Sequence, residues 1–269
     1  DLATAYAAID GHRTGDYSVT VLMTTDAGDT WTDITGDLPR DPEGGCAKVV
    51  REDRQNPNVL YCGTERGVFV TLDRGAHWLS LTGLVADPDA DEQDRGPKLP
   101  HVAVDDIIHH PLTHDLILGT HGRSIFILDD ASFLGQCTPQ VLASGLHAFA
   151  TRPARPRLNF HYDGFYGDNF FTAPNPQAGA QITYWVADDN LDDAKIEIKD
   201  SEGKTVRELS GSGRVGIHRV AWDLQLDTEK IVVNPADGPA WVEPGEYTVT
   251  IKVGEDLQSE TTVEVLPLR

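Results

Sequence analysis

The sequence predicts an all-β protein, and three observations carry this prediction. Short runs rich in Val, Ile, Thr and Tyr alternate with clusters of Gly, Pro, Asp and Asn along the chain. A unit of about 40 to 50 residues recurs in the first half, a spacing typical of repeat architectures. In the second half the repeat stops, but alternation of apolar and polar residues continues. Residues 138–149 are the one modest exception, where a helical turn is expected after Pro139.

The repeat is clearest between residues 58–73 and 115–130. "NVLYCGTERGVFVTLD" and "DLILGTHGRSIFILDD" share a Gly-Thr pair between two apolar runs and an Asp after the second run. A looser copy covers residues 4–26, with "TAYAAID" followed by "YSVTVLMTTD". Each copy therefore predicts a strand, a turn, a second strand, an Asp corner and a short third strand such as "WTDI" or "WLSL".

A leading strand is expected before the second and third copies, at "CAKVVRE" (46–52) and "VAVDDIIHH" (102–110). Four strands per repeat is the signature of a β-propeller blade. Residues 1–135 are thus predicted to form a partial β-propeller of about three four-stranded blades.

The octet "TTDAGDTW" at residues 24–31 returns as "TLDRGAHW" at residues 71–78. The Asp can accept hydrogen bonds from its own turn, and the Gly can take a positive φ that other residues resist. The Trp is expected to bury its ring where two sheets meet. These residues are therefore predicted to form corners rather than to act as acids and bases: Asp26, Gly28, Trp31, Asp73, Gly75, Trp78 and, in the third copy, Asp129.

The second half predicts an immunoglobulin-like β-sandwich over residues 179–269, of six or seven strands. A Pro-rich and aromatic connection, residues 136–178, is expected to pack between the domains. The predicted inner-face residues are Ile196, Ile198, Val220, Trp222, Leu224, Tyr247, Val249 and Ile251.

Composition narrows the function classes. The formal net charge of -21 repels nucleic acid and anionic membrane surfaces, and no apolar run is long enough for a transmembrane segment. No Cys-x-x-Cys or zinc-type His pair accompanies the three cysteines, so no metal or other cofactor is expected. Cys46 and Cys62 are expected either to bridge or to be buried free thiols, and Cys137 has no assigned role.

The octets resemble the Asp-box, or bacterial neuraminidase repeat, of sialidases, sortilins and large bacterial glycosyl-hydrolase-like propeller proteins. That resemblance implies that the box lies at the outer rim of a blade, remote from the ligand-binding axis. The third copy departs from the motif, because Ala131 stands in place of Gly and the Trp is missing. The segment "LGTHGRSIFILDD" still resembles the closing blade of bacterial sortilin-like proteins. Later segments resemble the tail of that family, which ends in an immunoglobulin-like module similar to that of the flagellar hook-cap protein.

Three groups of residues are candidates for binding. At a turn between two strands, an imidazole beside a guanidinium could position an anionic or sugar ligand, or could bond neighbouring carbonyls instead; these residues are Thr120, His121 and Arg123. An aromatic, Gly-rich segment could stack on carbohydrate or peptide, or could plug the space between the domains; its residues include Tyr162, Phe165 and Tyr166. A third group has metal-ligand types, but adjacent strand residues point to opposite faces; it comprises Asp105, Asp106, His109 and His110.

The predicted function is binding rather than catalysis. Three blades do not close a ring, and open sheet edges need covering, so other protein chains are expected as partners. We expect a non-catalytic binding or scaffolding subunit of a larger assembly, with a glycan or peptide as a further candidate ligand. The family resemblance and the lack of an initiator Met at Asp1 favour a processed, secreted, periplasmic or cell-surface chain. The alternative is a fragment of a sialidase-like enzyme whose catalytic residues lie mostly outside this chain, since no catalytic set is identified within it.

Overall fold

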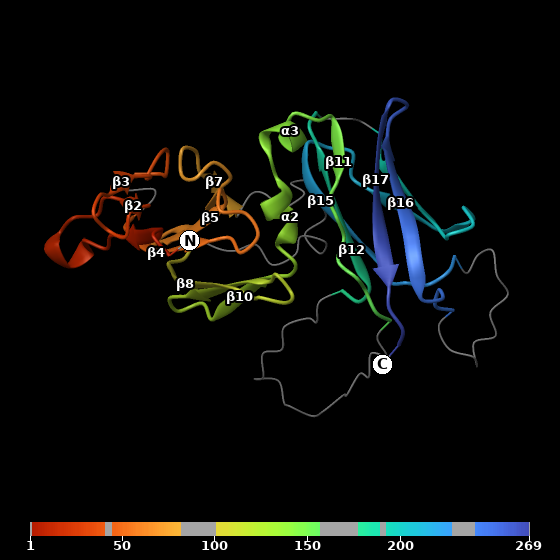
Figure 1. The fold of residues 1–269 in the computed structure, drawn as a ribbon, viewed down its shortest axis with the longest axis horizontal. Helices are drawn as coiled ribbons and strands as arrows, with labels where there is room; N and C mark the ends of the chain where they lie inside the picture. The colour runs from red at the N-terminus through yellow and green to blue at the C-terminus, as the bar shows by residue number, and fades with distance from the viewer. Residues whose placement is uncertain are drawn as a thin grey trace. The chain divides into compact units, whose positions relative to one another are not determined.

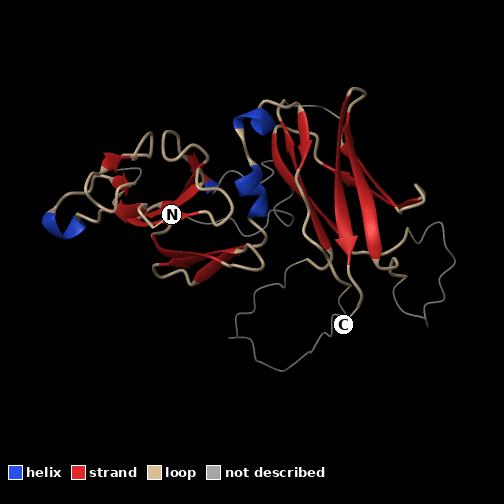
Figure 2. Ribbon diagram, viewed as in Figure 1, coloured by secondary structure: helices blue, strands red, loops and turns tan. Residues whose placement is uncertain are grey.

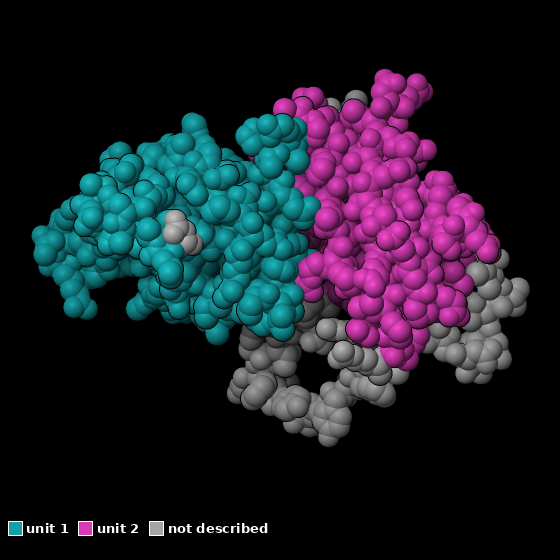
Figure 3. Space-filling view, viewed as in Figure 1, with its two compact units in different colours: residues 1–141 teal, residues 142–269 magenta. Residues whose placement is uncertain are grey.

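The computed structural model of the protein describes residues 2–40, 45–81, 101–156, 177–188, 192–227 and 240–268. The chain divides into two compact units, residues 1–141 and 142–269 (Figure 3). Both units are built from antiparallel strands, and the helical segments are short (Figure 2). The predicted all-β class is confirmed.

Unit 1 contains three antiparallel sheets within the described residues, one for each copy of the repeat (Figure 1). The first has the order β1-β2-β3, the second β4-β5-β6-β7 and the third β10-β9-β8. Both predicted leading strands are present, as β4 and β8. The strands are β1 (Ala5–Ala8), β2 (Val21–Thr24), β3 (Thr32–Asp33), β4 (Ala47–Glu52), β5 (Leu60–Thr64), β6 (Gly67–Thr71), β7 (Leu79–Ser80), β8 (Val104–His109), β9 (Leu116–Thr120) and β10 (Ile125–Leu128).

The second sheet lies between the other two. Every residue of β5 and β6 is buried. Leu60 and Cys62 belong to one apolar cluster with Val21 of the first sheet. Gly63 lies against the third sheet, where an added Cβ would come within 2.5 Å of the Val104 carbonyl oxygen. The glycine is therefore required by the close approach of β8, which is a reason for this residue type at this point of the repeat.

The strand count differs from the prediction in two sheets. The second sheet has four strands, whereas the first lacks a counterpart of β4 and the third a counterpart of β7 among the described residues. In the third copy, Ala131 has φ -81°, where Gly28 and Gly75 have φ +99° and +92°. An alanine resists the left-handed conformation of those glycines, and the chain instead enters a short helix, α2 (Ser132–Gln136). This helix was not predicted, whereas the turn expected after Pro139 is present as α3 (Pro139–Leu142).

Unit 2 is a β-sandwich with sheet orders β11-β12-β15 and β14-β13-β16-β17. Lettered in chain order A, B, C, C′, E, F and G, these sheets are A-B-E and C′-C-F-G, an immunoglobulin-type arrangement. The first strand lies inside the range expected as a connection, because Leu146 and Ala148 are buried and the strand pairs with β12. The strands are β11 (Leu146–Ala148), β12 (Ala180–Val186), β13 (Ala194–Lys199), β14 (Thr205–Gly211), β15 (Gly216–Trp222), β16 (Gly245–Val253) and β17 (Leu257–Val265).

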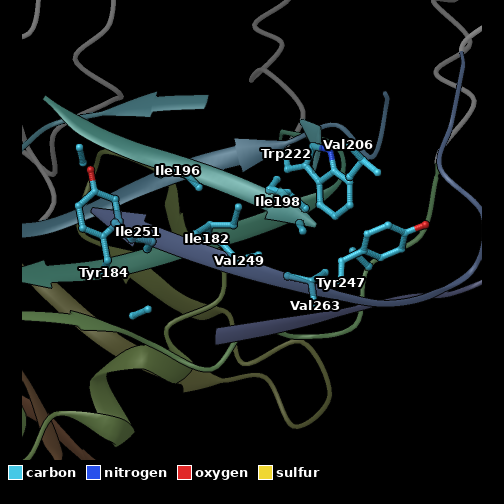
Figure 4. Close-up of a cluster of buried hydrophobic side chains, with 14 of the residues drawn as sticks. Ile182, Tyr184, Ile196, Ile198, Val206, Trp222, Tyr247, Val249, Ile251 and Val263 are labelled. Atoms are coloured by element: carbon cyan, nitrogen blue, oxygen red, sulfur yellow. The ribbon is translucent and has the colours of Figure 1, made fainter. Parts of the chain in front are cut away.

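The sandwich core fills the space between these two sheets (Figure 4). Trp222 is fully buried and contacts Tyr247 edge to face, with ring centroids 5.3 Å apart. Of the predicted inner-face residues, Val220 is partly buried and the other seven are buried. The alternation seen in the sequence therefore located this core correctly.

None of the helices in the described part of the chain combines the length and the apolar character needed to cross a membrane.

Candidate functional site

The first Asp-box carboxylate is engaged by its own turn. Asp26 Oδ1 accepts hydrogen bonds from the hydroxyl of Thr24 (2.7 Å) and the backbone N–H of Thr30 (2.9 Å), and its Oδ2 accepts from the Thr30 hydroxyl (2.6 Å). The bonds from Thr30 contribute most to lowering the pKa of Asp26 to about 2. A carboxylate held in this way stays ionised at neutral pH and stabilises the corner.

The second Asp-box repeats this geometry. Asp73 accepts from the Thr71 hydroxyl (2.8 Å), from the backbone N–H of His77 (2.9 Å) and from its imidazole (2.7 Å). Burial acts to raise the pKa of Asp73, but the bonds from His77 and Thr71 outweigh it, and the pKa is lowered. The two boxes are thus equivalent as turns.

The two tryptophans differ in their surroundings. The Trp78 ring is 6% exposed, its indole N–H donates to the Ile34 carbonyl (3.1 Å), and its backbone N–H donates to Asp37 Oδ1 (2.6 Å). We call this contact between the first two sheets the box junction; it consists of Ile34, Gly36, Asp37, Gly75 and Trp78. Trp31 is 45% exposed, so the expectation that its ring is buried is wrong. The two rings differ in exposure because Ile34 and Asp37 cover Trp78, whereas no described segment covers Trp31 in the same way.

In the third copy the acidic pair follows β10 directly. Asp129 stands at the position of Asp73, and Asp130 takes φ +46°, as Arg74 takes φ +59° in the second box. Asp130 Oδ1 accepts from the hydroxyl of Ser132 (2.6 Å) at the start of α2. The corner is kept, but it leads into a helix rather than a strand.

The predicted turn of Thr120, His121 and Arg123 joins β9 to β10. The Thr120 hydroxyl is used within the turn, where it donates to the Ser124 carbonyl (2.7 Å). The exposed His121 imidazole lies 3.4 Å from an Asp105 carboxylate oxygen, and Arg123 is also exposed. The turn therefore presents a cationic guanidinium and an imidazole to solvent, just before the start of β10.

An apolar row crosses the outer face of the third sheet. Ile127 pairs with Ile117, which pairs with Ile108, so the three side chains share one face. Ile125 lies two residues before Ile127 and therefore points the same way. Ile108, Ile125 and Ile127 are 54%, 64% and 57% exposed, although the opposite face of this sheet is buried through Ile107 and Leu118. We call Ile108, Ile117, Ile125 and Ile127 the β10 face.

Charged groups border the β10 face. Arg51 donates to Asp106 Oδ1 (2.8 Å) and to the Ile107 carbonyl (3.1 Å), which ties β4 to β8. Four residues have metal-ligand types, although their spacing argues against a shared ion. Of these, Asp105 faces His121 and Asp106 faces Arg51, while His109 points into the interior. His110 bonds the Thr113 backbone N–H (3.0 Å). The structure does not bring these four side chains together.

A buried polar network joins the second and third sheets, and sequence reasoning missed it. The Tyr61 hydroxyl donates to Asp53 Oδ2 (2.8 Å), and the imidazole of His109 lies 3.4 Å from the same oxygen. Burial lowers the pKa of His109 and raises that of Tyr61, so both are neutral near pH 7. A buried network of this kind fixes how two sheets pack, and no local spacing in the sequence signals it.

Among the described residues, one group of metal-ligand type converges in space: Asp10, Cys46 and Glu65. The ammonium group of Lys48 pairs with both carboxylates of that group, 2.8 Å from Asp10 and 3.2 Å from Glu65. The two carboxylates therefore already share a cation that belongs to the protein itself.

All three cysteines are buried free thiols, so of the two alternatives for Cys46 and Cys62 the structure has the unbridged one. Burial raises the pKa of Cys62 and of Cys137 to about 12. The aromatic candidates Tyr162, Phe165 and Tyr166 lie outside the described residues.

Comparison with known proteins assigns no family. No protein-family model matches the chain, and no curated protein does. Solved structures with partial similarity include an ancestral GH74 enzyme (13% identity, 78% of this chain, TM-score 0.26), an extracellular domain from B. thetaiotaomicron (9%, 92%, 0.26) and the BSP domain of a biofilm-associated protein (9%, 94%, 0.24). The chain spans 26%, 28% and 29% of the length of those three chains.

Proposed function

We propose that this chain is a non-catalytic, extracytoplasmic binding or scaffolding subunit that docks another protein on the β10 face. The observation that carries the proposal is the exposure of Ile108, Ile125 and Ile127 together on one face of a sheet. Single exposed apolar residues are common on protein surfaces, but a contiguous row bordered by charges is typical of interfaces. Aliphatic side chains offer no hydrogen bonds to sugar hydroxyls, so a protein partner fits this surface better than a glycan.

The edge of the same sheet supports a partner that adds a strand. In the second sheet, β7 pairs with β6 through Phe69 and Val70. In the third sheet the matching positions are Phe126 and Ile127, which pair with Leu118 and Ile117 as Phe69 and Val70 pair with Cys62 and Tyr61. No strand is placed on the outer side of these positions within the described residues. Backbone groups of β10 are thus available for strand addition, with alternate isoleucines giving specificity.

Charge and family resemblance complete the proposal. A net charge of -21 favours encounter with a basic partner. The Asp-box resemblance supports the extracytoplasmic location. Both Asp-box carboxylates bond their own turns, which supports a structural rather than catalytic role for them.

The test is capture of partners from native envelope fractions by the full chain and by an Ile125→Lys/Ile127→Lys variant. Lysine on an edge strand blocks strand pairing and disrupts an apolar contact. Leu112→Lys is the matched control, because Leu112 is exposed on the β8–β9 connection of the same sheet and outside the apolar row.

We expect the double variant to lose the captured partner at least tenfold, the control to retain it, and all three proteins to melt at the same temperature. Amide exchange of residues 125–128 should slow in the complex. Equal capture by the double variant and the wild type, or turnover of a panel of glycosides by the chain, would contradict the proposal.

A further inference from the structure

The box junction joins the second Asp-box to the first sheet by contacts of three kinds. A carbonyl of the first sheet accepts from the Trp78 indole, and a carboxylate, Asp37, accepts from the Trp78 backbone N–H. At Gly75 the absence of a side chain admits the Ile34 carbonyl, since an added Cβ would lie 2.5 Å from that oxygen. The junction therefore needs an acceptor for the indole, an acceptor for the backbone N–H, and a glycine.

The first Asp-box has the same backbone geometry as the second. Ala27 and Gly28 have φ +60° and +99°, against +59° and +92° for Arg74 and Gly75. The Thr24 hydroxyl accepts the Gly28 N–H at 3.0 Å, as the Thr71 hydroxyl accepts that of Gly75 at 2.8 Å. The half of a junction that carries the tryptophan and the glycine is thus preformed around Trp31.

At this box the three positions are open. Trp31 is 45% exposed, and neither its indole N–H nor its backbone N–H has a hydrogen-bond partner among the described residues. An added Cβ at Gly28 meets nothing within 4 Å. The first Asp-box therefore has the donors and the open glycine of the box junction, but no segment equivalent to Ile34–Asp37 covers them among the described residues.

We propose that the first Asp-box is an interaction surface for a further sheet of the same repeat type, which is not among the 269 residues and which lays an aliphatic-Thr-Gly-Asp strand end over Trp31. The template is Ile34-Thr35-Gly36-Asp37, whose carbonyl, tight turn and carboxylate satisfy Trp78. The sheet that docks would continue the order in which the first two sheets already pack.

A second copy of this chain does not fit that description. Its Ile34–Asp37 segment is already occupied by its own Trp78. The segment that follows Trp78 at the equivalent spacing reads Leu81-Thr82-Gly83-Leu84, which has no carboxylate for the Trp31 N–H. The inference concerns a different sheet from the β10 face, so each proposal is tested separately.

The test uses a tandem chain in which residues 2–58 are repeated ahead of Thr4, so that the added Ile34–Asp37 segment precedes Trp31 by one repeat. The added copy carries Trp31→Phe, which leaves a single Trp31 to be measured. Oxidation of that tryptophan by hydroxyl radicals is then quantified in its tryptic peptide, in the tandem chain and in the original chain.

We expect oxidation of Trp31 to fall about seven- to eightfold, the ratio between the exposures of Trp31 (45%) and Trp78 (6%). Asp37→Ala in the added copy alone should restore much of the reactivity, since it removes the acceptor for the backbone N–H. Trp31 oxidation that is unchanged, although amide exchange shows the added copy to be folded, would overturn the proposal.

A second chain covers the case in which the added copy does not fold. Here only residues 32–38 are joined ahead of Leu2 by a flexible Gly/Ser linker of about 20 residues, which reaches roughly 25 Å. Protection of Trp31 that depends on Asp37 supports the proposal, and failure of both chains to protect it refutes the proposal. Protection in the original chain that appears only as it dimerises would identify a second copy as the occupant and would also refute it.

Discussion

The two Asp-box glycines provide a matched pair that isolates the energy of the box junction. Gly28 and Gly75 have almost the same backbone conformation, with φ +99° and +92°. Alanine at either position incurs the strain of a left-handed conformation, about 1–2 kcal/mol. At Gly28 the added methyl meets nothing within 4 Å, whereas at Gly75 it meets the Ile34 carbonyl oxygen at 2.5 Å and the Ile34 Cβ at 2.8 Å. Because both contacts are with backbone or a branched Cβ, relief requires the sheets to move apart.

Overpacking of this kind adds about 1–3 kcal/mol. We therefore expect Gly28→Ala to lower the free energy of unfolding of unit 1 by about 1–2 kcal/mol, and Gly75→Ala by about 2–5 kcal/mol. Urea unfolding of the full chain measures both, with amide exchange of residues 67–71 identifying the transition of unit 1. The effect of alanine on the unfolded chain is the same in both variants and cancels in the comparison. Equal destabilisation by the two substitutions would refute the reasoning, because it would mean that Gly75 makes no close contact across the junction.

Three further predictions concern single residues. Trp78→Ala should destabilise unit 1 by about 3–5 kcal/mol, the cost of emptying a buried aromatic site. Trp31→Ala should destabilise it by less than about 1 kcal/mol, because that ring is half exposed. Similar values for the two variants in urea unfolding would contradict this reasoning from burial. The folded-state pKa of His109 lies below its ordinary value of 6.5, so the unfolded chain binds the proton first and unit 1 should lose stability as pH falls below about 6.5; His109→Gln should flatten this dependence in urea titrations at a series of pH values. The pKa of Asp26 is lowered to about 2, so the stability that its ionised carboxylate gives unit 1 should be present above about pH 4 and be lost as the pH falls toward 2. NMR titration of the Thr30→Val variant should find the Asp26 pKa raised toward 3.8. An unchanged pKa in that variant would show that the Thr30 hydroxyl is not the cause of the shift.

Strand positions could be read from the sequence because they depend on local alternation and on turn residues. The second sheet and the sandwich core follow the predicted pattern, since residues such as Ile196 and Val249 alternate in the sequence as they do in space. The structure of the third copy was harder to predict, because the chain forms a helix rather than a strand after Ala131, which stands in place of the glycine. A degenerate motif was evident in the sequence, but its structural outcome was not.

Features that depend on contacts between sheets could not be predicted. Trp31 and Trp78 occupy the same motif position, yet only the second is covered, and the covering residues lie more than 40 positions away. The network around Asp53 joins Tyr61 with His109, which is 56 positions distant from Asp53, and no spacing rule connects them. The β10 face was likewise missed, because exposure of apolar strand residues follows from what packs on the sheet, which the strand's own sequence does not state.

The enclosed position of the second sheet has an evolutionary consequence. Every residue of β5 and β6 is buried, so substitutions there are constrained by packing on both faces of the sheet. The exposed side chains on the outer faces of the first and third sheets are not constrained by packing within this unit. Selection can therefore alter what those side chains recognise, residue by residue, while the middle layer preserves the framework that holds them in place.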